Sequence, residues 1–280
     1  MTYTLAYSPC PNDTYVFAAL TNGLLEGAPG VRVHLADIEE LNNSAARGEF
    51  ELTKVSYGAI PFLMDRYRIL PSGGALGRGC GPLLVALPGA APPLFADLAG
   101  KRIAIPGERT TAYLLLQLAL GTRPKTVQMR FDQIAGAVAR GEVDAGLIIH
   151  ESRFTYREAG LIAIADLGEW WQNMTLLPTP LGAILVRDDI GDDEARAVNA
   201  AIRRSLAFAR ADEAPVMPYV REHAVEMNDQ VMRAHIELYV NEYTDDLGEN
   251  GRDAVRALFS RAHDAGILRR EVEPRFAAVS

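Results

Sequence analysis

A histidine at the end of a short apolar run is the residue in this chain best suited to acid–base chemistry. The run 145–149 has the composition of a strand buried on both faces, and it stops abruptly at His150, Glu151 and Arg153. In an open parallel α/β sheet, ligands bind outside the carboxyl ends of the strands. Because imidazole exchanges a proton near neutral pH, His150 is the first candidate for a catalytic base, with Glu151 and Arg153 as candidate substrate contacts. The alternative is a histidine that only caps the strand by hydrogen bonding.

A second polar group ends a strand predicted over residues 51–56. Lys54, Val55 and Ser56 are its last three residues, in a chain with only three lysines among its 28 basic residues. A lysine at such a position is usually solvated at a sheet edge, and the other interpretation is a ligand contact. If the chain forms two facing lobes, this group lies opposite His150, which favours a role in substrate binding.

Two threonines begin a helix predicted over residues 110–120. Thr110 and Thr111 follow a turn, and the first amide groups of a helix have no intrahelical partners. Because these amides and the helix dipole both favour an anion, a substrate carboxylate is a natural ligand here. N-capping by Thr110 explains the same residues without a ligand, and the two interpretations are compatible.

The segment 8–14, SPCPNDT, contains two prolines that stiffen a turn between a predicted strand and a predicted helix. Such a turn would hold Asn12 or Asp13 against a ligand, although helix capping by either residue is a sufficient explanation. Cys10 is interpreted as a small loop residue, because the sequence shows no partner histidine for it. The histidines other than His150, among them His235, occupy positions without a polar cluster and are predicted to be structural or surface residues.

A glycine-rich stretch, 73–81, matches neither of the nucleotide-binding patterns GxGxxG and GxxxxGK[ST], and it precedes a strand rather than a helix. We therefore predict a flexible hinge in this stretch, with Arg78 available to a ligand. The sequence contains no HExxH motif, no paired CxxC motif and no aspartate cluster. These patterns therefore give no indication of a metal site.

The composition of the 280 residues is that of a globular protein, with 49% apolar and 23% charged residues. The net charge of −8 argues against a nucleic-acid ligand, because neutralising phosphates requires a clustered basic face. No apolar run approaches the ~18 residues of a membrane span, and the N-terminus lacks the pattern of an export signal. We therefore expect a cytoplasmic protein with a small-molecule ligand, as a monomer or a homodimer.

Strand-like and helix-like segments alternate through most of the chain, which predicts parallel α/β sheets with right-handed crossovers. The letters ARGE occur at 46–49 and again at 139–142, and each time the next strand ends in polar residues after a similar interval. This repeat suggests one unit used in each of two lobes, although a chance match of four letters is the alternative. A linker-like run at 88–93 supports the division. The predicted lobes are a discontinuous first lobe, 1–85 with 185–280, and a second lobe, 86–184.

Five segments together resemble one enzyme family, the 1,4-dihydroxy-6-naphthoate synthases of the futalosine route to menaquinone. The segments are long enough for the resemblance to be specific, and it covers nearly the whole chain. They are SPCPNDT (8–14), LTKVSYGA (52–59), SGGALGRGCGP (72–82), ERTTAY (108–113) and AGLIIHESRFTY (145–156).

The resemblance implies an α/β fold of two lobes similar to type 2 periplasmic binding proteins, with the ligand cleft between the lobes. It also implies cleavage of cyclic dehypoxanthine futalosine to 1,4-dihydroxy-6-naphthoate and dihydroxyacetone, without a cofactor. The family's proton-accepting histidine matches His150, and its substrate-contacting segments match 54–56 and 110–111. We expect Lys54 and Ser56 to orient oxygen atoms of the substrate. The helix N-terminus at Thr110 is then expected to bind the substrate carboxylate.

Two other functions use the same scaffold. One is a small-anion binding or sensing protein that binds its ligand without turnover, which the fold alone does not distinguish from an enzyme. A binding protein of a transport system is expected to carry an export signal, and a ligand-sensing regulator is expected to carry a DNA-binding segment. The sequence shows the pattern of neither, which weighs against both forms of this alternative. The other is the related chorismate dehydratase of the same pathway, and the cluster at His150 and Glu151 argues against it.

Overall fold

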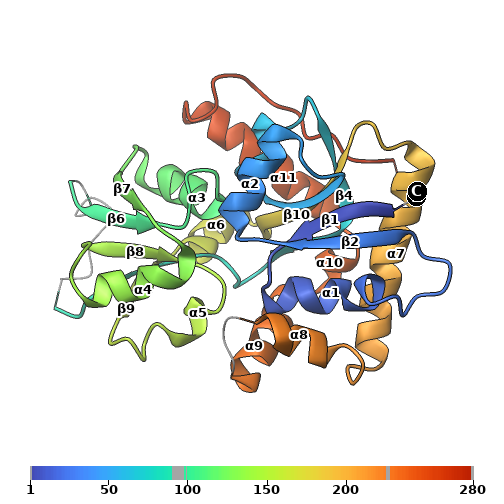
Figure 1. The fold of residues 1–280 in the computed structure, drawn as a ribbon. Coiled ribbons are helices and arrows are strands. Elements are labelled where there is room, and N and C mark those ends of the chain that lie inside the picture. The colour runs from blue at the N-terminus through green and yellow to red at the C-terminus, as the bar shows by residue number, and fades with distance from the viewer. Residues whose placement is uncertain (1, 90–97, 99, 225–227, 279–280) are drawn as a thin grey trace.

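Two five-stranded sheets form two lobes that lie side by side (Figure 1). The computed structural model describes residues 2–89, 98, 100–224 and 228–278. The first sheet contains β1 (Thr2–Tyr7), β2 (Gly30–Leu35), β3 (Leu52–Ser56), β4 (Tyr67–Gly77) and β10 (Thr179–Arg187). The second sheet contains β5 (Leu83–Ala86), β6 (Arg102–Ile105), β7 (Lys125–Gln128), β8 (Ala145–Ile148) and β9 (Ile162–Asp166).

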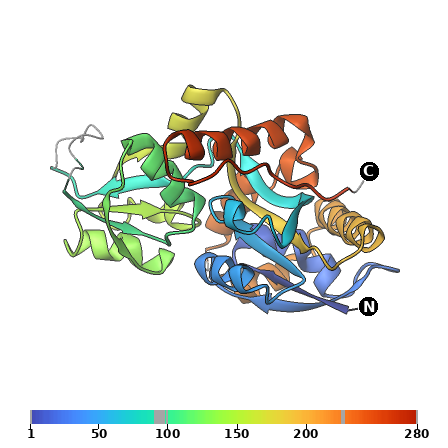
Figure 2. The same ribbon diagram turned by 90° about the horizontal axis from the view of Figure 1, so that it is seen from above.

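Helices cover both sheets. Those of the first lobe are α1 (Pro11–Thr21), α2 (Ile38–Arg47), the short 3-10 helix η1 (Ile60–Phe62), α7 (Asp192–Ala211), α8 (Met217–His223), α9 (Asp229–Tyr239), α10 (Glu242–Asp245) and α11 (Gly248–Asp264). Those of the second lobe are α3 (Thr111–Leu120), α4 (Phe131–Ala139), α5 (Ser152–Thr155) and α6 (Leu167–Thr175). Both ends of the chain lie at the first lobe (Figure 2).

The two sheets repeat one strand order. The first runs β2-β1-β3-β10-β4 and the second runs β7-β6-β8-β5-β9, so β3 and β8 occupy equivalent central positions. The unit that the ARGE repeat predicts is therefore present once in each lobe. Lys54 belongs to β3 and His150 follows β8. Because these strands are equivalent, both residues belong to the carboxyl-terminal parts of corresponding strands, where ligands bind in such sheets.

The expectation of wholly parallel sheets is wrong. β10 runs antiparallel to both of its neighbours, β3 and β4, and β5 runs antiparallel to β8 and β9. Each of these two strands is the first that the chain forms after it passes from one lobe to the other. Since a returning strand enters from the opposite end of the sheet, it pairs antiparallel. A crossover helix is not needed for such a strand.

The connections between the lobes are short. The chain passes to the second sheet over residues 78–82 and returns over 176–178, and the predicted lobe boundaries at 85 and 184 fall inside β5 and β10. Of the predicted linker, residues 90–93 lie outside the described part of the chain. Within the described part, no helix is long and apolar enough to cross a membrane.

The glycine-rich stretch is mostly a strand rather than a flexible loop. β4 extends through Gly77, and its residues are almost all buried. Gly73 has a φ of 81°, and a Cβ atom there would lie 3.0 Å from Ile184 of β10 and 3.1 Å from Ile202 of α7. Glycine is therefore needed both for the left-handed backbone and for close packing between the strand and the helix.

Two hydrophobic cores enclose the first sheet. One lies between the sheet and α1, α7, α8 and α9. The other is shared by the two lobes, because Val55 and Tyr57 of the first lobe belong to the same cluster as Leu115 of α3, Leu147 of β8 and Leu258 of α11. Through this shared core the two lobes pack against each other.

Candidate active site

A cavity of about 630 Å³, counted with the part open to solvent, lies between the two lobes. The first lobe lines it with Lys54 and Ser56 of β3. The second lobe lines it with Thr110 and Thr111 at the start of α3, and with His150 after β8. Candidate residues that are far apart in the sequence therefore border one space, as the repeat predicts.

His150 stands at the junction of two cavities. A second cavity of about 400 Å³ shares Ser8, Ile38 and His150 with the first. The backbone of His150 is left-handed, with a φ of 55°, and its ring packs edge-on against Phe131 with 4.8 Å between the ring centroids. A left-handed non-glycine residue carries about 1–3 kcal/mol of strain, which is a common feature of functional sites.

The electrostatic surroundings of His150 favour a neutral ring. Burial lowers the pKa of His150 below its ordinary value of 6.5, although the carboxylates of Asp37 and Asp13 act in the opposite direction. Burial has this effect because it penalises the charged imidazolium form. At physiological pH the ring is therefore able to accept a proton.

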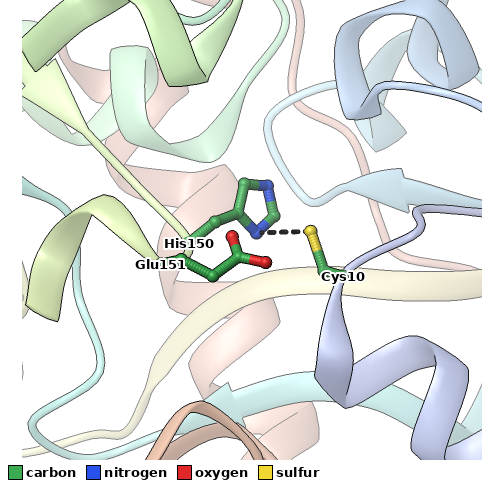
Figure 3. A group of neighbouring side chains, drawn as sticks. All are labelled: Cys10, His150 and Glu151. Carbon is green, nitrogen blue, oxygen red and sulfur yellow. Dashed lines mark hydrogen bonds between the residues drawn. The ribbon is translucent and has the colours of Figure 1, made fainter. Parts of the chain in front are cut away.

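The thiol of Cys10 touches His150 across the boundary between the lobes. Its Sγ atom lies 3.3 Å from Nδ1 of His150 (Figure 3). Burial raises the pKa of the Cys10 thiol well above its ordinary value, and the charge of Glu151 adds to this effect. The group is therefore a neutral thiol rather than a nucleophilic thiolate. Cys10 thus has a histidine neighbour that the sequence did not show, whereas its neutral thiol agrees with the interpretation that it is not a nucleophile.

Cys10, His150 and Glu151 also form the group of described residues whose ligand atoms could surround a metal ion. One ligand atom from each lies within 4.8 Å of the other two. Sequence motifs could not predict this group, because Cys10 is 140 positions away from His150. A metal would have to displace the proton of a thiol whose pKa is raised, and metal binding at this position is therefore coupled to proton release.

Lys54 is a buried cation and not a solvated residue at a sheet edge. Its side chain is 4% exposed, and Nζ donates to Oδ1 of Asp13 over 2.6 Å and to the carbonyl oxygen of Gly73 over 3.2 Å. The Asp13 carboxylate also accepts hydrogen bonds from Ser8 and Asn12. The ion pair is thus well satisfied, which is the condition for burying two charges together.

The prediction that Asn12 or Asp13 caps α1 is wrong. The N-cap residue is Cys10, whose side chain makes no capping hydrogen bond, and Pro11 is the first residue of the helix. Proline is favoured at this position because its fixed φ suits the helix and no amide hydrogen is needed. Asn12 and Asp13 consequently lie in the first helical turn, from which their side chains reach Lys54 and His235.

His235 of α9 is a cavity residue that the sequence did not reveal. It is completely buried, lines the cavity, and lies nearly parallel to His150 with 6.3 Å between the ring centroids. Its Nε2 atom forms a 2.9 Å hydrogen bond with Oδ1 of Asn12. Burial, with a smaller contribution from His150, lowers the pKa of His235 well below 6.5. The predictions of a surface position and of a position without a polar cluster are therefore wrong, whereas the prediction of a structural role stays untested.

Ser56 is oriented by an asparagine of α2. The Asn42 amide donates to Oγ of Ser56 over 3.2 Å and to Oε2 of Glu39 over 3.0 Å, and its Oδ1 accepts from the Ser56 amide over 2.8 Å. Because Oγ of Ser56 accepts from Asn42, its own proton is available to an acceptor in the cavity. Burial raises the pKa of Glu39, and Glu39 also accepts a hydrogen bond from the amide of Arg109 in the second lobe.

The start of α3 makes direct contact with the first lobe. Thr110 is the N-cap, and its hydroxyl accepts from the Tyr113 amide and donates to the carbonyl oxygen of Gly107. The Thr111 hydroxyl accepts from the Gly58 amide over 3.1 Å and donates to the carbonyl oxygen of Leu181 over 2.7 Å. Both hydroxyls are therefore occupied within the protein. Because the Tyr113 amide is bonded to Thr110, the first-turn amides left for an anion are those of Thr111 and Ala112.

Four of the predicted contact residues do not line either cavity. Val55 is fully buried in the shared core, and the Arg78 guanidinium donates to the carbonyl oxygen of Leu176. Arg153 forms an ion pair with Asp166 and donates to two backbone carbonyl oxygens of the 78–82 connection. Glu151 is buried beside Cys10 and His150.

The sequence held a signal for Cys10 but none for His235. Cys10 follows β1, and the end of that strand faces the same crevice as the ends of β3 and β8, which a consistent use of the strand-end rule would have indicated. His235 lies on a helix 223 positions after its partner Asn12. Only the packing of α9 against α1 brings the two together.

Comparison with known proteins shows which family this chain is similar to. Residues 3–264 match the family model described as menaquinone biosynthesis. The chain belongs to this family. Two members of known name are similar to it over almost their full lengths.

Both members carry the name 1,4-dihydroxy-6-naphtoate synthase. The protein from Thermus thermophilus is 50% identical over 273 residues, which cover 97% of this chain and 98% of the relative. The protein from Streptomyces coelicolor is 48% identical over 272 residues, which cover 95% of each chain. The menaquinone family that the sequence resembles is thus confirmed.

The fold extends beyond the menaquinone family. The alkanesulfonate-binding protein from Xanthomonas axonopodis pv. citri aligns with a TM-score of 0.75 at 16% identity, covering 97% of this chain and 96% of that one. Other matching structures also have the fold of periplasmic binding proteins. The predicted two-lobe α/β architecture is therefore confirmed.

Proposed function

We propose that the protein cleaves cyclic dehypoxanthine futalosine to 1,4-dihydroxy-6-naphthoate and dihydroxyacetone, with His150 as the proton acceptor. Membership of the menaquinone family and the names of relatives at 50% and 48% identity support the reaction. The observation that carries the mechanism is the position of His150. Its half-buried ring, with a lowered pKa, lines a cavity that both lobes enclose.

The reaction requires one base and a stabilised oxyanion. In a retro-aldol cleavage, the base removes the proton of a hydroxyl group, and the carbon that carried this hydroxyl becomes a carbonyl as the carbon–carbon bond breaks. The electron pair of that bond passes to an enolate oxyanion on the other fragment, which then takes up a proton. The ring becomes aromatic when its ketone form tautomerises to the dihydroxy form, as carbon-bound protons move to oxygen. His150 is suited to the first step, since a neutral imidazole accepts the proton and can return it to the product.

Binding of the substrate carboxylate is assigned to the first turn of α3. This helix has ten residues, and its N-terminal amides and dipole favour an anion beside the cavity. The Ser56 hydroxyl, contributed by the first lobe, lines the same cavity and has a proton to donate, because it accepts a hydrogen bond from Asn42. Lys54 is committed to Asp13, so we assign it a role in positioning the wall of the cavity rather than direct binding of oxygen atoms.

The contacts between the lobes serve the same chemistry. Thr111 joins α3 to Gly58 and Leu181, and Glu39 joins α2 to Arg109. These contacts limit the access of water to the cavity, which strengthens the electrostatic interactions of the oxyanion and protects the intermediate. Opening of the lobes then becomes the step that admits substrate and releases products.

A turnover assay with both products monitored tests the proposal. The purified protein is incubated with cyclic dehypoxanthine futalosine, and the naphthoate and dihydroxyacetone are measured separately. Equal amounts of both products, formed over many turnovers, are expected. Saturable binding without either product would support the alternative of a binding protein, which the similarity to the alkanesulfonate-binding protein favours. Loss of water from chorismate instead would identify a dehydratase.

A further inference from the structure

His235, which lines the cavity, has a nitrogen atom without a hydrogen-bond partner among the described residues. Its Nδ1 atom is buried and has no hydrogen-bond partner among the described residues, whereas its Nε2 atom is bonded to Asn12. The residue lines the same cavity as His150 and is completely buried. A buried polar atom without a partner is uncommon in folded proteins and requires an explanation.

The network behind His235 determines which of its nitrogen atoms carries the proton. The Asp13 carboxylate accepts hydrogen bonds and therefore faces the amide nitrogen of Asn12, which donates to it over 2.8 Å. Oδ1 of Asn12 consequently faces His235, and Nε2 of His235 must be the donor in that 2.9 Å bond. A neutral imidazole with its proton on Nε2 has a bare lone pair on Nδ1.

The surroundings of His235 also determine its charge state, which is neutral. Burial lowers the pKa of His235 well below 6.5, and the neighbouring His150 ring adds to this effect. The ring therefore remains neutral, and Nδ1 remains an acceptor throughout the physiological pH range. A group of this kind recognises a hydrogen-bond donor and does not attract a carboxylate or a carbonyl oxygen.

We propose that Nδ1 of His235 accepts a hydrogen bond from a hydroxyl group of the substrate and so selects for the polyol part of that molecule. The inference rests on the proposed function, because release of dihydroxyacetone requires a substrate that carries hydroxyl groups. The stacked arrangement with His150, at 6.3 Å, brings the recognised hydroxyl close to the base. His235 thereby directs the substrate so that its reacting hydroxyl meets His150.

Two substitutions separate the acceptor from the structural bond. In His235→Gln, the side-chain amide reaches the position of Nε2, so the bond to Asn12 is retained while the acceptor at Nδ1 is lost. In His235→Asn, the side-chain oxygen takes the place of Nδ1, so the acceptor is retained while the bond to Asn12 is lost. A purely structural histidine would tolerate the glutamine and not the asparagine.

Steady-state kinetics on both variants tests the proposal. His235→Gln is expected to lower kcat/KM roughly tenfold, which is the effect of one lost neutral hydrogen bond, and His235→Asn is expected to lower it less. A substrate analogue with the recognised hydroxyl replaced by hydrogen should lose the same factor with the wild type and nothing further with His235→Gln. Wild-type kinetics for His235→Gln would overturn the assignment. It would also be overturned if every deoxy analogue lost as much kcat/KM with His235→Gln as with the wild type.

A binding measurement keeps this test separate from that of the proposed function. The ¹⁵N NMR signal of Nδ1 in His235 is followed while dihydroxyacetone is added to the wild-type protein. Movement toward the position of a hydrogen-bonded acceptor is expected, even for a protein that fails to cleave the proposed substrate. If cleavage occurs and this signal does not move at saturating dihydroxyacetone, the proposal for His235 is wrong and the proposed function stands.

Discussion

Sγ of Cys10 and Nδ1 of His150 lie 3.3 Å apart, although the two residues belong to different lobes and are 140 positions apart in the sequence. If Nδ1 carries the proton and donates it to sulfur, the lone pair of Nε2 is available to take a proton from the substrate. Cys10 is then a positioning residue, which fixes the tautomer of the base without touching the substrate.

Replacement of Cys10 tests this role. Cys10→Ala removes the acceptor for the Nδ1 proton of His150. We expect kcat to fall roughly tenfold, because less of His150 then has the tautomer with a lone pair on Nε2. KM should change little, because Cys10 does not bind the substrate. Cys10→Ser supplies a hydroxyl oxygen in the same position and should retain most of the activity. Steady-state kinetics on the two variants decides the question, and equal activity of Cys10→Ala and the wild type would exclude the tautomer role.

The pH dependence of catalysis follows from the lowered pKa of His150. Protonation of the ring removes the base, so kcat/KM must fall on the acid side. Because the pKa is lower than 6.5, the midpoint of the acid limb should lie below pH 6.5. A profile of kcat/KM from about pH 4.5 to about pH 8 measures the midpoint of this acid limb. An acid limb centred above 6.5 would contradict the electrostatic description of the site.

The stability of the fold should depend on pH in the same direction. His150 and His235 both have lowered pKa values in the folded state, so the unfolded chain binds more protons than the folded one as the pH falls below 6.5. Their contribution to stability is fully present above the unfolded pKa and decreases toward the folded values. Urea unfolding at neutral and acidic pH measures the change, and a His235→Gln variant should show a weaker dependence. An identical slope in that variant would contradict this assignment.

The buried ion pair of Lys54 and Asp13 makes a prediction about stability. Lys54→Met leaves the Asp13 carboxylate buried without its cation, and we expect the free energy of unfolding to fall by about 3–5 kcal/mol. The double variant Lys54→Met with Asp13→Asn removes both charges and should recover part of that loss. Denaturant unfolding of the single and double variants gives the coupling. A loss below about 1 kcal/mol in the single variant would show that the pair is not desolvated as described.

Much of the fold was accessible from the sequence because its signals are local. Gly48 ends α2 in a left-handed conformation, Thr110 caps α3, and the buried run before His150 forms β8. The repeated ARGE letters correctly predicted a repeated unit, since they mark the same helix end in each lobe. Such features depend on neighbouring residues alone, and the long-range packing does not change them.

The parts that were not predicted depend on packing between distant segments. β10 and β5 run antiparallel because the chain changes lobes before each of them, which strand periodicity does not encode. Gly73 belongs to a strand because it packs against Ile184 and Ile202. The partnership of Asn12 with His235 likewise exists only after α9 has packed against α1.

The contact between the lobes at Gly58 can be disturbed by a single methyl group. A Cβ atom at Gly58 would lie 2.7 Å from the backbone oxygen of Thr110, so Gly58→Ala must move α3 away from the first lobe. We expect KM to rise roughly tenfold through loss of the closed site. Gly136→Ala within α4 is the matched control, because a Cβ there meets only the flexible tip of Arg140. Unchanged kinetics for Gly58→Ala would mean that closure at this contact is not required.

Replacement of His150 by asparagine is the most direct test of the central claim. Asparagine tolerates the left-handed backbone at this position, so His150→Asn should fold with near wild-type stability, measured by urea unfolding. With the base removed, single-turnover release of dihydroxyacetone should slow by a factor of about 10²–10⁴, while the Kd for cyclic dehypoxanthine futalosine stays close to that of the wild type. Release of dihydroxyacetone at a near wild-type rate would contradict the mechanism.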